Sequence, residues 1–85
     1  MLSLSILARA VKQLAKMPRV DAQAVMGKLE AYAADRGAPV DVKPLRGEKG
    51  VLRLRHGDWR AIFEIDPKAR TMVVVEVVNR RDAYT

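Results

Sequence analysis

The alternation of apolar and polar residues is clearest between residues 51 and 66, where it predicts two strands joined by a tight turn around Gly57. Glycine readily takes the positive φ that such turns require. Because side chains alternate between the two faces of a strand, each face of this hairpin has its own character. One face carries Leu52, Leu54, Trp59, Ala61, Phe63 and Ile65, and the opposite face carries Arg53, Arg55, Arg60 and Ile62. We expect the function on the arginine-bearing side.

Before the hairpin, the pattern predicts a short strand followed by two helices. Leucine and serine alternate over residues 2–5, as in a strand, and Ser5 can then cap the first helix. That helix is predicted to end at Met17–Pro18, because the residue before a proline disfavours the α conformation. Asp21 can cap the second helix, and Gly37 followed by a proline ends it. Both helices carry apolar stripes at helical spacing, so we expect an antiparallel helical hairpin.

The rest of the chain predicts a connector and one more strand. Residues 38–50 contain several prolines and glycines and are interpreted as the connector. A turn at residues 66–70 leads into residues 71–78, which are β-branched almost throughout, as in a central strand. We therefore predict an α+β fold in the order strand, helix, helix and three strands, with a small antiparallel sheet covered on one face by the helices. The chain of 85 residues is predicted to form one domain, residues 1–85.

Composition narrows the classes of function. The net charge of +6 and the isoelectric point of about 10.2 favour a polyanionic partner, such as nucleic acid or an acidic protein. The chain has no cysteine and one histidine, which excludes disulfides, thiolate metal sites and a histidine-rich metal site. No apolar run is long enough to cross a membrane, and early charged residues argue against a secretory signal. We therefore expect a cytoplasmic protein.

The last strand extends the arginine-bearing side. The residues expected to face the helices are Val73, Val75 and Val77, and those expected to face away are Val74, Glu76, Val78 and Arg80. Arg80 then joins the arginines of the hairpin in one cluster, edged by Tyr84. Guanidinium forks suit phosphate oxygens, and an aromatic ring can stack on a base, so the cluster favours RNA binding. The alternative is a solvated outer face on which Arg60 pairs with Asp58 or Glu64.

Three segments of the chain carry recognisable motifs, Leu45–Gly47, Leu52–Ile65 and Val77–Tyr84. Together with the first helix, Ala8–Pro18, they resemble the RelE/ParE toxin superfamily of type II toxin–antitoxin systems. The most specific part of the match is the Arg-x-Gly-Asp-aromatic-Arg core within Leu52–Ile65. The resemblance spans nearly the whole chain, is closer to RelE than to ParE, and implies a RelE-like α+β fold.

The resemblance implies a toxin and leaves three alternatives for what it does. RelE-like members enter the ribosomal A site and cut mRNA without a metal or other cofactor, by attack of a ribose 2′-OH on the adjacent phosphate. ParE-like members poison DNA gyrase and are not nucleases. The third alternative is a degenerate toxin that only binds its antitoxin. All three imply a cognate antitoxin, whose acidic, amphipathic segment is expected to wrap the toxin over the helical hairpin or the arginine face.

The family's site residues carry over to matching positions of this sequence. Arg60 matches the arginine that stabilises the transition state, and Arg80 matches the arginine beside the leaving group. Tyr84 matches the tyrosine that stacks on the substrate or deprotonates it. The residues expected to bind RNA phosphates are Arg53, Arg55 and Arg81. No metal ligand is implied.

The sequence also departs from the family pattern. Val51 stands where RelE has a second functional lysine, which leaves the general base unidentified, and Asn79 replaces the histidine common before the arginine pair. Histidine titrates near neutral pH, so His56 is a candidate base, but a solvent-exposed turn residue is the favoured interpretation. Glu76 is expected to pair with an arginine rather than to act as a base.

Overall fold

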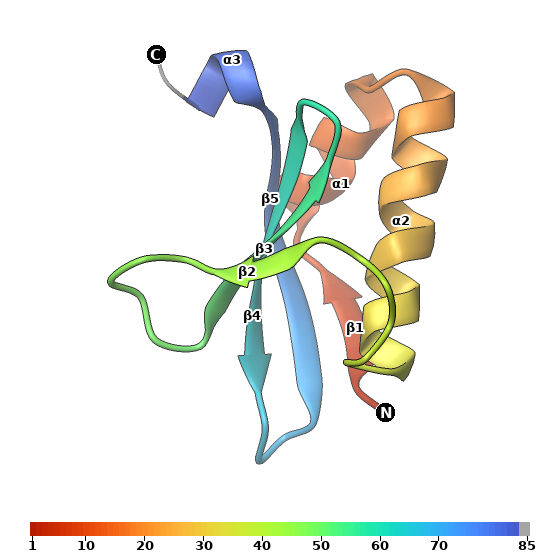
Figure 1. Ribbon diagram of the computed structural model, residues 1–85. Coiled ribbons are helices and arrows are strands. Elements are labelled where there is room, and N and C mark those ends of the chain that lie inside the picture. The colour runs from red at the N-terminus through yellow and green to blue at the C-terminus, as the bar shows by residue number, and fades with distance from the viewer. Residues whose placement is uncertain (84–85) are drawn as a thin grey trace.

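The computed structural model describes the backbone of residues 1–83 and the side chains of residues 1–81. Five strands form one mixed sheet, and two helices pack on one of its faces (Figure 1). The elements are β1 (Ser3–Ile6), α1 (Ala8–Lys16), α2 (Arg19–Ala34), β2 (Val42–Pro44), β3 (Val51–His56), β4 (Trp59–Asp66), β5 (Thr71–Asn79) and α3 (Arg80–Ala83). The strands lie in the order β1-β5-β4-β3-β2. The predicted α+β fold, with a helical hairpin on one sheet face, is confirmed.

The hairpin of β3 and β4 forms as its alternation predicts. The two strands pair antiparallel, with Leu54 opposite Ala61 and Arg55 opposite Arg60. The turn between them contains Gly57 at a φ of 57°, a left-handed conformation that glycine adopts without steric cost. β4 pairs with β5 in the same antiparallel sense. The prediction that the last three strands form an antiparallel unit is therefore confirmed.

Two features of the sheet differ from the prediction. β1 runs parallel to β5, with Ser3 opposite Thr71, so the sheet is mixed rather than wholly antiparallel. The alternation in residues 2–5 specifies a strand, but it specifies neither the partner of that strand nor its direction. The predicted connector also contains β2, in which Val42 pairs with β3. β2 is short and ends in Pro44, which suits an edge strand and gives too brief a pattern to be detected in the sequence.

The strand β5 does not keep a single alternation along its length. The register with β4 shifts between Ile62 and Phe63, and Val75 is the extra residue on β5. Such a β-bulge moves the alternation by one residue. The buried residues of β5 are Met72, Val74 and Val77. The predicted orientation is therefore wrong before the bulge, where Val74 rather than Val73 is buried, and correct after it.

Two helices form in the predicted segments, but three of their ends differ from the prediction: both starts, and the end of α2, which lies at Ala34 rather than at Gly37. Ser5 lies in β1 rather than at a helix cap, and α1 begins at Ala8 without a side-chain cap. α1 ends before Met17, whose extended backbone precedes the proline as predicted. α2 begins at Arg19, so Asp21 lies in its first turn, where a carboxylate interacts favourably with the helix dipole. Over residues 1–83, no helix has the length and apolar character needed to span a bilayer.

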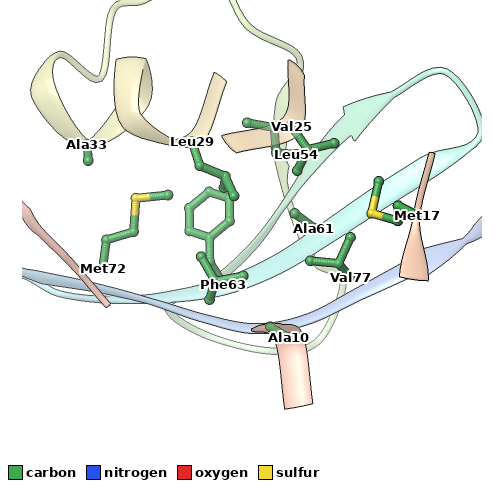
Figure 2. Close-up of a cluster of buried hydrophobic side chains, with 11 residues drawn as sticks. Ala10, Met17, Val25, Leu29, Ala33, Leu54, Ala61, Phe63, Met72 and Val77 are labelled. Carbon is green, nitrogen blue, oxygen red and sulfur yellow. The ribbon is translucent and has the colours of Figure 1, made fainter. Parts of the chain in front are cut away.

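The core lies between the helical hairpin and the apolar face of the sheet. Phe63 of β4 stands near its centre and points toward Leu29 of α2 (Figure 2). Both side chains are fully buried, and the Tyr32 ring lies 5.6 Å from that of Phe63, centroid to centroid. The other core residues are Ala10, Met17, Val25, Ala33, Leu54, Ala61, Met72, Val74 and Val77. This burial holds α1 and α2 on one face of the sheet, so neither of these helices covers the opposite face (Figure 1).

Candidate functional site

Basic side chains gather on the sheet face opposite the helices. Arg55 lies opposite Arg60 across β3 and β4, and Lys43 lies opposite Arg53 across β2 and β3. Residues paired in this way project to the same face of a sheet. The two pairs are separated by two residues along β3, or roughly 7 Å. We refer to Lys43, Arg53, Arg55 and Arg60 as the basic face.

Two guanidinium groups of the basic face contain nitrogen atoms that are buried without an acceptor. These atoms are Nη1 of Arg53 and Nη1 of Arg60, and neither has a hydrogen-bond partner among the described residues. Nη1 of Arg53 lies 3.8 Å from Oδ1 of Asp41, which is an ion-pair distance but too long for a hydrogen bond. A buried donor left without an acceptor destabilises a protein by about 1–3 kcal/mol. An anion bound here would supply the acceptors that the two groups lack.

Arg55 and Lys43 are the exposed members of the basic face. The Nε of Arg55 donates a hydrogen bond of 3.3 Å to the carbonyl oxygen of Gly57, which holds the side chain beside the β3–β4 turn. The site therefore combines two half-buried arginines with two exposed cations. Planar guanidinium forks and a neighbouring ammonium group are suited to the oxygens of a phosphodiester. The register thus brings together Arg53, Arg55 and Arg60, as predicted from the sequence.

The C-terminal site residues are placed differently from the prediction. The strand alternation was extended to Arg80, but β5 ends at Asn79 and Arg80 begins α3. The backbone N–H of Arg80 donates to the carbonyl oxygen of Asp58, so α3 starts beside the β3–β4 turn. The backbone N–H of Arg81 donates to Oδ1 of Asn79 at 3.1 Å, and both arginines are exposed. Tyr84, the predicted catalytic tyrosine, lies outside the described residues.

His56 lies on the helix side of the sheet, away from the basic face. Its Nδ1 is 2.9 Å from Nζ of Lys28, and its Nε2 is 3.3 Å from Oδ1 of Asp21. An ammonium group can only donate, so Nδ1 accepts and the Nε2–H donates to the carboxylate. The interpretation of His56 as an exposed turn residue is therefore wrong. These contacts also give it a role in attaching α2 to β3 rather than a role as the general base.

Two expectations from the sequence concern ion pairs of acidic residues with arginines. Oε1 of Glu76 lies 3.8 Å from Nη1 of Arg9, so the predicted pairing of Glu76 with an arginine is confirmed. Among residues 1–81, Arg60 forms no ion pair with Asp58 or Glu64, so the alternative based on such a pair is wrong. The Arg60 guanidinium is therefore not neutralised by either carboxylate.

Lys43 is the residue of the basic face that the sequence interpretation missed. On β3, Val51 stands at the position that the resemblance assigns to a second functional lysine. Lys43 lies on the neighbouring strand β2, directly opposite Arg53. The signal in the sequence was weak, because only Val40 and Val42 alternate with polar residues inside a segment interpreted as a connector. The strand pairing, rather than the sequence spacing, brings this ammonium group to the site.

Sequence comparison identifies the family to which this domain belongs. A family model described as "ParE toxin of type II toxin-antitoxin system, parDE" matches residues 4–84. The chain belongs to this family. It is therefore a toxin of a type II toxin–antitoxin module, within the RelE/ParE superfamily that the sequence resembles. No curated protein matches the sequence.

Solved structures of RelE toxins share the fold. The RelE chain of the RelB–RelE complex from Methanococcus jannaschii matches with a TM-score of 0.81 and 20% identity, over 94% of each chain. The RelBE2 complex from Mycobacterium tuberculosis matches with a TM-score of 0.77 and 28% identity, over 93% of this chain and 98% of that chain. The isolated RelE toxin of E. coli matches with a TM-score of 0.78 and 17% identity, over 93% of this chain and 84% of that chain. The RelE-like fold predicted from the sequence is thus confirmed.

Proposed function

We propose that this toxin is a metal-independent, ribosome-dependent mRNA endonuclease that inhibits translation. The observation that carries the proposal is the pair of buried, unsatisfied guanidinium nitrogens of Arg53 and Arg60, on the sheet face opposite α1 and α2. A phosphodiester offers several acceptor oxygens at close spacing, which matches this demand. The net charge of +6 further favours a polyanionic substrate and a ribosomal surface rich in phosphate.

The proposed reaction is an intramolecular phosphoryl transfer. The ribose 2′-oxygen attacks the adjacent phosphorus while the bond from phosphorus to the 5′-oxygen of the next nucleotide breaks. The 2′-OH proton passes to a base and the leaving 5′-oxygen receives a proton, so the products carry a 2′,3′-cyclic phosphate and a 5′-OH. Negative charge builds up on the non-bridging oxygens, where preorganised donors stabilise the transition state.

Each residue predicted from the sequence has a role in this scheme, and the structure adds Lys43 to them. Arg60 stabilises the charge of the transition state, and Arg80 stabilises the leaving group. The residues that hold the flanking phosphates are Lys43, Arg53, Arg55 and Arg81. Tyr84 stacks on a base or takes the 2′-OH proton. Action on translating ribosomes places the toxin in the cytoplasm.

The experiment that tests this proposal maps new 5′ ends in mRNA shortly after the toxin is induced alone. We expect cuts within translated codons that disappear when translation initiation is blocked. The double variant Arg60→Ala, Arg80→Ala should lose both the cuts and the growth arrest. The matched control is Arg19→Ala, which removes an exposed arginine from the start of α2 and should remain toxic. Undiminished cutting by the double variant would disprove the proposal.

Gyrase poisoning is the second candidate function. It is favoured by Val51, which stands in place of a functional RelE lysine, and by a family model that bears the ParE name. Induction of the DNA-damage response with intact mRNA would support this function instead. Normal growth after induction would support a degenerate toxin that only binds its antitoxin.

We also propose that a cognate antitoxin covers part of this domain. The matching structures include RelB–RelE complexes, in which a RelE-like chain is bound to its antitoxin. An acidic, amphipathic segment would complement the net charge of +6 and could cover either the helical hairpin or the basic face. A pull-down with the product of the adjacent gene tests this partner. The absence of a complex at micromolar concentration would count against it.

A further inference from the structure

A second feature occupies the same sheet face, one row of residues beyond Arg53. It is a hollow of about 440 Å³ lined by Lys49, Gly50, Val51, Glu64, Ile65, Asp66, Thr71 and Val73. The strand register places Val51 opposite Glu64 and Glu64 opposite Val73, whereas Arg53 lies opposite Ile62. The hollow therefore adjoins the basic face, at a distance of roughly 7 Å along the strands. Its volume is within the range of small-ligand sites.

The lining combines apolar walls with one uncommitted carboxylate. Val51 and Val73 flank Glu64 on the neighbouring strands. Oδ1 of Asp66 already accepts backbone hydrogen bonds of the turn that follows β4. Within residues 1–81, Glu64 takes part in no ion pair or side-chain hydrogen bond. The hollow thus offers a free acceptor between apolar surfaces, with the ammonium group of Lys49 as a donor on its lining.

The charge distribution favours a base rather than a phosphate in this hollow. Carboxylates of Glu64 and Asp66 repel a phosphate, whereas the basic face attracts it. An RNA strand whose phosphate lies on Arg53 and Arg60 would therefore turn an adjacent base toward the hollow. Side chains commonly read splayed bases of single-stranded RNA by hydrogen bonds to the Watson–Crick edge.

Guanine is the base whose edge matches these groups. Its N1–H and N2–H are adjacent donors that a single carboxylate can accept together, and its O6 is an acceptor that an ammonium group can reach. Adenine and cytosine each offer one amino donor next to a ring nitrogen whose lone pair would face the carboxylate. Uracil offers one N–H between two carbonyl groups. The lining therefore discriminates by the number and order of donors.

We propose that the hollow lined by Glu64 and Lys49 is a guanine subsite for the nucleotide next to the phosphate held by the basic face. The proposal rests on the RNA-cleaving function proposed above and adds a base preference to it. Glu64 accepts from N1–H and N2–H, Lys49 donates to O6, and Val51 and Val73 contact the faces or edges of the ring.

The test uses the full chain and ribosomes programmed with mRNAs that differ at one position of the A-site codon. Single-turnover cleavage is measured with guanosine, inosine, adenosine or uridine at that position. We expect guanosine to be cut about tenfold faster than adenosine, because a bidentate pair discriminates bases by roughly that factor or more. Inosine lacks the N2 amino group and should be intermediate.

Variants then assign the preference to the hollow. Glu64→Gln and Lys49→Ala should each reduce the preference for guanosine to about twofold, mainly by slowing cleavage of the guanosine codon. The matched control is Glu30→Gln, which changes an exposed glutamate of α2 and should keep the full preference. A wild-type toxin without base preference, or a Glu64→Gln variant that keeps it, would overturn the subsite while leaving the nuclease function intact. Failure of the wild type to cut any codon would overturn the nuclease function, and the subsite with it.

Discussion

The two faces of the sheet differ in what they bury. The helix side buries apolar side chains, whereas the opposite side buries guanidinium nitrogens that have no hydrogen-bond acceptor within residues 1–81. On the helix side, Phe63 and Leu54 are fully buried, and no polar or charged residue is buried in the part of the chain that the structure describes. On the opposite side, Arg53 and Arg60 hold buried nitrogens without acceptors within residues 1–81. The first face stabilises the fold by apolar burial, whereas the second keeps destabilising, unsatisfied donors. The comparison indicates that stability and ligand binding are assigned to opposite faces.

The largest expected effect tests the stabilising role of the helix face. Phe63→Ala should lower the free energy of unfolding by about 3–5 kcal/mol, because it removes a fully buried ring and leaves a cavity. Urea denaturation followed by circular dichroism measures this change. Phe63→Leu, which keeps most of the apolar volume, should cost clearly less. Equal stability of wild type and Phe63→Ala would contradict the assignment of stability to this face.

The next effect tests the basic face. Arg60→Ala should reduce mRNA cleavage by about 10²–10³-fold, as expected for loss of one preorganised donor to a transition state. The free energy of unfolding should not fall, because the variant also removes a buried donor that lacks an acceptor. Programmed ribosomes and urea denaturation give the two quantities. A loss of stability comparable to that of Phe63→Ala would show that Arg60 belongs to the core instead.

Lys43→Ala tests whether the edge strand β2 contributes to the site. Cleavage should fall by about tenfold, consistent with loss of one charge-assisted hydrogen bond to a phosphate. The matched control is Lys68→Ala, in the turn between β4 and β5, which should cleave at the wild-type rate. Lys43→Arg should retain most activity. Equal rates for Lys43→Ala and Lys68→Ala would show that Lys43 takes no part in cleavage.

The smallest effect concerns His56, which lies on the helix side although it was considered as a base. His56→Ala should lower the free energy of unfolding by about 1 kcal/mol for each hydrogen bond lost, to Lys28 and to Asp21. Cleavage should be unchanged. A double-mutant cycle with Asp21→Asn measures the coupling of the pair by denaturation. A large loss of cleavage at wild-type stability would restore His56 as a catalytic residue.

The features that could be predicted from the sequence are those fixed by short-range geometry. Gly57 marks a turn because it adopts a positive φ, and Pro18 ends the first helix because it disfavours an α conformation before it. The alternation within β3 and β4 placed Arg53 and Arg60 on one face, as the register confirms. The catalytic roles of these residues stay predictions.

The features that could not be predicted depend on partners distant in the sequence. The bulge at Val75 exists only in relation to β4, and it reverses the orientation expected for the first half of β5. Arg80 leaves the strand alternation because the chain turns into α3 beside Asp58. His56 and Lys28 are 28 residues apart and meet only because α2 packs against β3.

The sequence by itself determined a two-faced hairpin, two apolar helical stripes, a positive charge and the toxin family. These follow from the conformational preferences of each residue and from local alternation. The tertiary structure decided that β2 sets Lys43 beside Arg53, and that the register places Glu64 between Val51 and Val73. Strand pairing and bulges depend on how the whole chain buries its apolar surface, so a local pattern does not specify them. The composition of the candidate site is therefore a property of the folded sheet.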